Sequence, residues 1–243
     1  MAAGYVTVFV SRVRNVVERT DLRDREGVYP DRRHAGLVLA EMMRDRLPSG
    51  TLVLAVPAGG VPVAVALARA LGLALDVAVI SKIPPPWNPE VGYGAVAFDG
   101  SMLLNQPLLD QLGLRDSEVQ RGVELTRQKV RRRLKLLRNS RPPLELIGRA
   151  VVLVDDGLAT GFTLLCGFAA IRDAQAARII LGVPTAHARS LEAVAESFDE
   201  TYCPNIRSGG TFAVAGAYQH WDDVSEAQAQ QLLNEYWQEQ GGL

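Results

Sequence analysis

The sequence has 243 residues, of which 48% are hydrophobic and 22% are charged, so it holds enough apolar material for one large α/β domain. Its formal net charge of −1 gives no electrostatic reason to expect nucleic acid or an anionic membrane surface as a partner. The two cysteines, Cys166 and Cys203, are too few for a disulfide framework or a cysteine-rich metal site, and the cytoplasm is the expected compartment.

No stretch reaches the roughly 20 apolar residues that cross a bilayer. An apolar patch at residues 5–10 lacks the preceding basic residues of a signal peptide. We therefore expect neither a membrane span nor a secretory leader.

Apolar runs and helix-like segments then alternate along the chain. The run Thr51–Gly60 is rich in β-formers and stops at proline and glycines, and helical composition follows as far as Gly72. Further apolar runs lie at residues 73–81, 149–157, 177–184 and, more weakly, 200–204. Because these runs do not alternate with polar residues, they predict a doubly wound α/β fold with a mostly parallel sheet covered on both faces.

A long insertion, residues 83–148, separates the second and third predicted strands. Its first part is rich in proline and glycine and predicts a loop, within which Tyr93–Phe98 can form a short strand or hairpin. Long loops in compact domains are often lids or binding elements. Its second part predicts one helix over residues 116–139, capped by Asp116 or Ser117, with an apolar stripe at Val119, Val123, Val130, Leu134 and Leu137.

The second half of that helix is strongly basic. Seven residues between Arg127 and Arg138 are basic and none is acidic. Such a run is usually the solvated face of an amphipathic helix. The other interpretation is an arginine that reaches a phosphate in the same or a neighbouring subunit.

The stretch Val151–Leu165 carries the clearest chemistry. Its apolar strand ends at Asp155 and Asp156, at the edge where open parallel sheets bind ligands. Glycine N–H groups, two threonine hydroxyls and the N-terminus of a helix predicted over residues 164–174 follow, which together form a phosphate cradle. The carboxylates then either accept hydrogen bonds from sugar hydroxyls or hold a hydrated divalent cation. The lysine of a Walker motif is missing, and the spacing is not G-x-G-x-x-G.

The segment VVLVDDGLATGFT resembles the signature of the type I phosphoribosyltransferases, in which two acids follow an apolar strand and precede Thr-Gly-x-Thr. The resemblance implies binding of 5-phosphoribosyl 1-diphosphate (PRPP), with Asp155 and Asp156 on the ribose 2′ and 3′ hydroxyls. It also implies a loop around the 5′-phosphate that contains Gly157, Ala159, Thr160, Gly161, Phe162 and Thr163.

Two further segments resemble the same family. VPAGGVPVA resembles the pyrophosphate loop, where the family often has a non-proline cis peptide, and here Ala58, Gly59 and Gly60 would hold it. A plain glycine turn is the alternative. VISKI places Ser81 and Lys82 at the end of the second predicted strand, where adenine phosphoribosyltransferases have an Arg-Lys pair. Lys82 would then face pyrophosphate, unless it is simply an exposed lysine, and serine at position 81 removes one expected phosphate contact.

The resemblance also assigns a lid and a hood. Residues 83–100 occupy the position of the flexible lid, with Glu90, Tyr93 and Asp99 as polar candidates. Residues 204–243 resemble the carboxyl-terminal hood, where Phe212 and Tyr218 would stack on the acceptor unless they serve packing. The similarity is greatest to a subgroup of uncharacterised, predicted phosphoribosyltransferases. It implies one domain over residues 1–243, with its core at about residues 29–203.

The implied reaction is transfer of a 5-phosphoribosyl group from PRPP to a nitrogen nucleophile, a nucleobase or similar heterocycle, with release of pyrophosphate. Its cofactor is Mg²⁺, held through PRPP and water near Asp155 and Asp156 rather than by direct protein ligands. The alternative is a non-catalytic regulator that binds PRPP or a nucleotide. A homodimer is the assembly that the family suggests, and the residues leave the acceptor open.

Overall fold

The computed structural model describes residues 8–10, 15–89, 91–139 and 141–241. Glu90 and part of the apolar patch at residues 5–10 therefore lie outside the described residues. The described chain forms a central sheet of seven strands in the order β1-β2-β11-β9-β8-β3-β4. The pairing of β1 with β2 is antiparallel and the other pairings in this sheet are parallel. The strands are Val8–Val10 (β1), Val16–Arg19 (β2), Leu52–Ala55 (β3), Ala74–Val77 (β4), Ala150–Val154 (β8), Arg178–Gly182 (β9) and Glu200–Tyr202 (β11).

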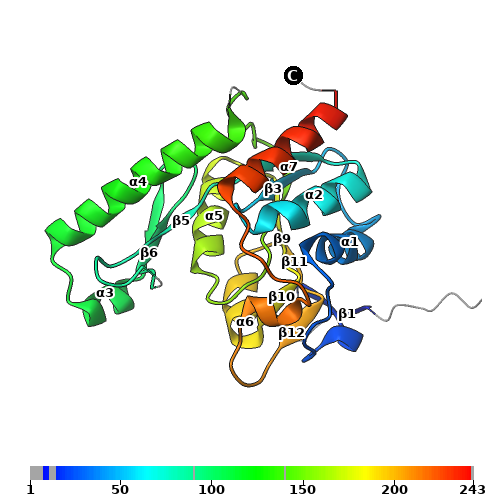
Figure 1. Ribbon diagram of the computed structural model, residues 1–243, viewed down its shortest axis with the longest axis horizontal. Helices are drawn as coiled ribbons and strands as arrows, with labels where there is room; N and C mark the ends of the chain where they lie inside the picture. The colour runs from blue at the N-terminus through cyan, green and yellow to red at the C-terminus, as the bar shows by residue number, and fades with distance from the viewer. Residues whose placement is uncertain (1–7, 11–14, 90, 140, 242–243) are drawn as a thin grey trace, which may run out of the picture.

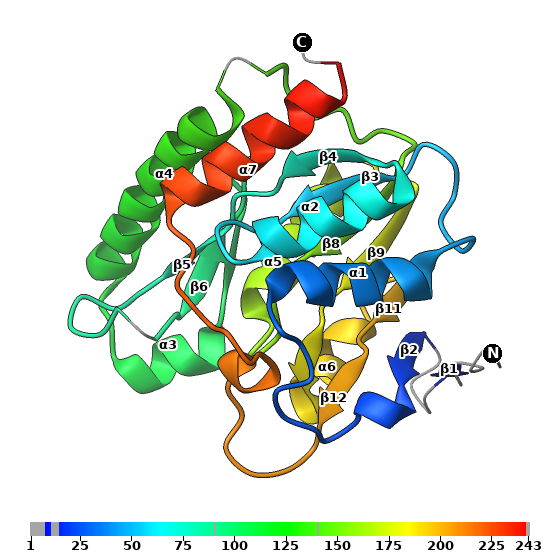
Figure 2. The same ribbon diagram turned by 45° about the vertical axis from the view of Figure 1, so that its right-hand side comes forward.

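Helices cover both faces of this sheet, as Figures 1 and 2 show. One face packs against α1, α2 and α7, and the other against α5 and α6. Successive residues of β8 alternate between the two cores: Val152 and Val154 belong to the first, Val151 and Leu153 to the second. The predicted fold class is confirmed. These helices are Arg32–Met43 (α1), Gly60–Leu71 (α2), Phe162–Asp173 (α5), Ala188–Ala195 (α6) and Glu226–Glu239 (α7).

The insertion forms an extension beside the main sheet (Figure 1). A second, antiparallel sheet joins β5, β6 and β7, and its middle strand β6 is the short strand predicted within Tyr93–Phe98. The predicted basic helix is also present, and the stripe residues Val123, Val130 and Leu137 are buried. The elements of the extension are Ser81–Ile83 (β5), Gly94–Val96 (β6), Met102–Leu104 (β7), Gln106–Leu112 (α3) and Asp116–Arg138 (α4).

Two local predictions were wrong. Helix α4 is capped by Arg115 rather than by Asp116 or Ser117, because the Glu118 carboxylate accepts the Arg115 backbone N–H at 2.9 Å. Lys82 does not end the second strand of the main sheet. That strand, β4, ends at Val77, and the apolar run continues because Val79 and Ile80 are buried in the connection to β5.

The carboxyl-terminal part of the chain returns to the ends of the parallel strands. Strand β12 (Asn205–Arg207) pairs with β10 (Thr185–His187), and the short 3-10 helix η2 (Val214–Ala217) follows. Helix α7 then lies beside α2 and α4 and contacts both (Figure 2). No helix in the described ranges is long and apolar enough to cross a membrane.

Candidate functional site

The candidate site lies at the carboxyl ends of the neighbouring strands β3 and β8. Their parallel register pairs Ala55 with Val154, and the Val56 N–H donates to the Val154 carbonyl at 2.8 Å. The loop after β3 and the acid pair after β8 therefore begin side by side. Two motifs that are about a hundred residues apart in the sequence meet at one edge of the sheet.

The glycines of the first loop touch the acid pair directly. A Cβ on Gly59 would overlap Asp156 Oδ2, and one on Gly60 would lie 2.7 Å from the Val154 carbonyl and 2.9 Å from Asp155 Cα. Only glycine permits this approach of the loop to the carboxylates. The peptide bond between Pro57 and Ala58 is cis, as the resemblance led us to expect for this loop.

Burial sets the charge state of the two carboxyl groups. It raises the pKa of Asp155 well above the ordinary range, and the adjacent Asp156 raises that pKa further. Burial also raises the pKa of Asp156, against the lowering effect of Arg32. The Asp156 N–H donates to Asp155 Oδ1 at 2.9 Å, which fixes the two residues relative to each other. The pair is thus more basic than exposed aspartates.

Arg32 is a site residue that sequence reasoning missed. Its Nε donates to Asp156 Oδ2 at 2.9 Å, and its Nη1 donates to the Asp222 carbonyl at 2.7 Å. The guanidinium also stacks on Trp221, with Cζ 3.7 Å from the ring centroid. Arg32 and Arg33 both lie in the first turn of α1, and only Arg32 is buried, so its position in the sequence gave no signal that it has a partner in the site.

The carboxyl-terminal segment supports the acid pair from another side. The Tyr218 hydroxyl donates to the Asp156 carbonyl at 2.6 Å. Burial raises the pKa of Tyr218 well above its ordinary value, so this hydroxyl stays protonated. Val214 of η2 packs so closely on Gly157 that a Cβ there would overlap its side chain. The predicted hood segment therefore contacts the backbone of the site at Asp156 and Gly157, through Tyr218 and Val214.

The predicted phosphate loop leads from the acid pair into α5. Ala159 and Thr160 are exposed, and Gly161, with φ of 76°, precedes the first helical residue, Phe162. The helix begins earlier than the segment from Leu164 that the sequence suggested, so Phe162 and Thr163 lie in its first turn. The N–H groups of that first turn lack intrahelical partners and are suited to an anion.

Of the two predicted acceptor-stacking residues, Tyr218 is not accessible in this structure. Its side chain is buried, with Tyr29 and Trp221 at 5.6 and 5.1 Å between ring centroids. Phe212 is half-buried beside His187 and Arg207. The structure thus separates the two residues by role: Tyr218 supports Asp156, whereas Phe212 retains an accessible ring.

Lys82 lies on β5, and its side chain is exposed. It lines a cavity of about 1020 Å³ between the segment after β5 and α4. Of the polar lid candidates, Tyr93 is buried and Asp99 accepts the Ser101 N–H and hydroxyl in a turn. Neither Tyr93 nor Asp99 is therefore a free polar group of a lid.

The side chains present fit a magnesium ion held mainly by substrate. In the described part of the chain, no group of three or more histidine, cysteine, aspartate or glutamate side chains could hold a metal. Asp155 and Asp156 supply two carboxylates, and one oxygen of Asp156 is already bonded to Arg32. Magnesium commonly uses one or two carboxylates together with substrate phosphates and water.

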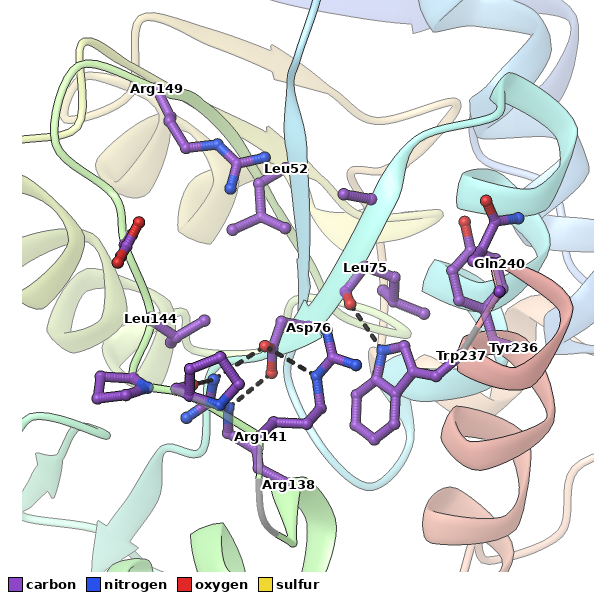
Figure 3. Close-up of a pocket in the computed structure, with 15 residues that line it drawn as sticks. Leu52, Leu75, Asp76, Arg138, Arg141, Leu144, Arg149, Tyr236, Trp237 and Gln240 are labelled. Atoms are coloured by element: carbon purple, nitrogen blue, oxygen red, sulfur yellow. Dashed lines mark hydrogen bonds and ion pairs between the residues drawn. The ribbon is translucent and has the colours of Figure 1, made fainter. Parts of the chain in front are cut away.

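A second cavity, of about 460 Å³, lies at the opposite end of the strands, beside Leu52 and Ala74 (Figure 3). Asp76 accepts hydrogen bonds from Arg138 there at 2.8 and 3.0 Å, with Arg141 at 3.7 Å. The Arg141 guanidinium lies 4.3 Å from the ring centroid of Trp237. These contacts join the end of α4 to β4 and α7, which is a structural role.

Comparison with known proteins identifies the family that the sequence motifs resemble. Residues 39–218 match the family described as "Phosphoribosyl transferase domain". A Mycobacterium tuberculosis protein named "Putative phosphoribosyl transferase" is 32% identical over 215 residues, which cover 85% of this chain and 46% of that protein. The chain thus spans about half the length of the curated relatives that it matches. The crystal structure of the protein TT1426 from Thermus thermophilus aligns with a TM-score of 0.72 and 32% identity, over 86% of this chain and 98% of that one.

Proposed function

The chain belongs to the phosphoribosyl transferase family, as predicted from its sequence, and we propose that it transfers the 5-phosphoribosyl group of PRPP to a nitrogen nucleophile and releases pyrophosphate. One observation carries this proposal: Gly59 and Gly60 lie against Asp156 and Asp155. PRPP carries its pyrophosphate on the anomeric carbon, next to the 2′ hydroxyl. A site for it therefore needs an anion-binding loop in contact with groups that accept bonds from a diol.

The acid pair is the proposed ribose site. Asp155 and Asp156 accept hydrogen bonds from the 2′ and 3′ hydroxyls, which hold the sugar against the glycine loop. Their basicity, which follows from burial, strengthens these bonds. Arg32 and Tyr218 fix Asp156 through its side chain and its backbone carbonyl, so the geometry is formed before substrate arrives.

The phosphate loop and the glycine loop are the proposed anion sites. N–H groups around Gly161 and the start of α5 bind the 5′-phosphate, with Thr160 and Thr163 as hydroxyl donors. The backbone of Ala58–Gly60, at the start of α2, binds the pyrophosphate, and Lys82 adds a positive charge. Magnesium bound to PRPP beside the acid pair would neutralise charge on the leaving pyrophosphate. The protein orients the sugar so that the nitrogen acceptor attacks the anomeric carbon as the bond to pyrophosphate breaks.

Four finer expectations belong to this proposal. Phe212 contacts the acceptor, because its ring is the accessible one of the two aromatic candidates. The compartment is the cytoplasm, because two cysteines are too few for a disulfide framework. The acceptor is a nucleobase or similar heterocycle, and the assembly is a homodimer.

The experiment is a measurement of pyrophosphate released from PRPP and magnesium with a panel of purines, pyrimidines and small nitrogen heterocycles, together with PRPP binding by calorimetry. Release with one acceptor, and loss of release when that acceptor is omitted, would support the transferase. Failure of the intact protein to bind PRPP would refute it. Binding without release from any acceptor would favour the non-catalytic regulator.

A further inference from the structure

The large cavity beside Lys82 is walled by α4 as well as by the segment after β5. Lys82 comes from β5 and Lys129 from the middle of α4, and both side chains line this cavity of about 1020 Å³. Figure 2 shows α4 alongside β5, and the two elements are in contact. The helix thus brings a second lysine to the cavity that Lys82 lines.

Positive charge exceeds negative charge along this cavity. Arg115 and Arg121 line it together with the two lysines. Glu118 is the only carboxylate among the described lining residues, and it is already paired with Arg115, with Nε 3.1 Å from Oε2. The described lining therefore carries a net positive charge, and an anion is the ligand that such a cavity attracts.

Arg133 connects this cavity to the glycine loop. Its Nη2 donates to the Pro57 carbonyl at 3.1 Å, and its Nη1 donates to the Ser81 hydroxyl at 3.3 Å. Its Nε donates to Glu226 of α7 at 2.6 Å, and its side chain is only 9% exposed. One buried guanidinium thereby bonds to three segments. It reaches the Pro57 carbonyl in the glycine loop, the Ser81 side chain next to Lys82, and Glu226 at the start of α7.

Lys129 lies one helical turn before Arg133. Residues four apart share a face of a helix, so the side chains of Lys129 and Arg133 are neighbours on α4. A rise of about 6 Å over four residues places Lys129 within reach of a ligand that extends from the glycine loop. Partial burial lowers the pKa of Lys129, as do the charges of Arg133, Arg132 and Lys82, whereas Glu226 raises it. The cations are thus close enough to repel one another, and an anion between them would relieve that repulsion.

We propose that Lys129 binds the pyrophosphate group of PRPP together with Lys82, and that Arg133 is the positioning residue that joins this lysine pair to the glycine loop. The inference rests on the proposed function. It gives the basic helix α4 a direct part in the site, and it supplies the cation that the serine at position 81 does not.

The test compares two ligands that differ in the pyrophosphate group: PRPP and ribose 5-phosphate. Each is titrated calorimetrically, with magnesium, into the full chain and into two variants. Lys129→Gln removes the proposed contact, and Lys135→Gln removes an exposed lysine from the same helix as a matched control. We expect Lys129→Gln to weaken PRPP binding by about tenfold and ribose 5-phosphate binding by less than about twofold. Lys135→Gln should change neither.

Three outcomes would overturn the inference. In the first, Lys129→Gln binds PRPP as tightly as the unaltered protein. In the second, it loses both ligands equally, which indicates a general change of structure or charge rather than a pyrophosphate contact. In the third, Lys135→Gln weakens PRPP as much as Lys129→Gln does. Failure of the proposed function is distinguishable, because the unaltered protein would then bind neither PRPP nor ribose 5-phosphate.

Discussion

Arg32 and Asp156 form an ion pair, with Nε 2.9 Å from Oδ2, although 124 residues separate them in the chain. Both side chains are largely buried, at 9% and 16% exposure. Helix α1 thereby fixes the charge and orientation of a carboxylate that follows β8. Through this contact, the amino-terminal helix α1 contributes a side chain to the candidate site.

The first prediction concerns this ion pair and pH. Arg32 lowers the pKa of Asp156, so Arg32→Gln raises that pKa further above its ordinary value. A carboxyl group with a higher pKa is ionised only at higher pH. Ionised carboxylates accept the ribose hydroxyls, so PRPP affinity is lost as the pH is lowered and the carboxylates are protonated. This loss should begin at a higher pH in Arg32→Gln than in the unaltered protein.

The measurement is the dissociation constant of PRPP as a function of pH. Arg33→Gln serves as the control, because Arg33 is the exposed neighbour in the same helical turn. Its profile should match that of the unaltered protein. Coincident profiles for Arg32→Gln and Arg33→Gln would contradict the role given to the ion pair.

The second prediction concerns the close approach at Gly59. Its φ is −59°, an ordinary value for any residue, so an alanine there acts only through its Cβ, which would overlap Asp156 Oδ2. We expect Gly59→Ala to destabilise the fold by about 1–3 kcal/mol through overpacking. Displacement of the carboxylate should also weaken PRPP binding by at least about tenfold.

Thermal unfolding and PRPP titration of Gly59→Ala measure both effects. Gly209→Ala is the matched control, since a Cβ at Gly209 meets no atom within 4 Å. If the two variants behave alike, the loop and the acid pair are not in contact as described.

The third prediction separates the two aromatic residues. Tyr218→Phe keeps the buried ring and removes the hydroxyl that donates to the Asp156 carbonyl. PRPP affinity should fall by about 1 kcal/mol, or roughly fivefold, with the fold intact. Phe212→Leu should instead raise the KM for the acceptor and leave PRPP affinity unchanged. If Tyr218→Phe instead raises the KM for the acceptor and Phe212→Leu weakens PRPP binding, Tyr218 rather than Phe212 contacts the acceptor.

The fourth prediction concerns Asp76 on the edge strand β4, whose side chain is 8% exposed and pairs with Arg138 and Arg141. Asp76→Ala leaves two arginines without their carboxylate and should lower the free energy of unfolding by about 3 kcal/mol. PRPP affinity should not change at temperatures where the variant is folded. Denaturant unfolding and PRPP titration check this, and a selective loss of affinity would show that the Asp76 cluster is coupled to the site.

The sequence predicted those parts of the fold that depend on local pattern. The apolar runs that end at Ala55 and Val154 are strands, because a strand buried on both faces has continuous apolar residues. The long helix α4 followed from its apolar stripe. The acid pair and the glycine loop were recognisable because each motif is contiguous in the chain.

The features that the sequence did not predict depend mainly on contacts between distant segments of the chain. Arg32 reaches Asp156 and Arg133 reaches Pro57 only after the chain has folded, and no local pattern distinguishes them from exposed arginines. Arg133 was one of seven basic residues in its run, and only burial on the inner face of α4 sets it apart. The end of β4 was misplaced because a buried connection is as apolar as a buried strand.

The measurement that tests the central claim most directly is PRPP binding to the double variant Asp155→Asn, Asp156→Asn. Burial raises both pKa values, so the ionised pair costs stability as pH rises above the unfolded-state value, and the neutral amides remove this cost at neutral pH. We predict a folded protein whose PRPP affinity is reduced by at least about a hundredfold. Unchanged PRPP affinity in the folded double variant would contradict the assignment of the acid pair to the ribose hydroxyls.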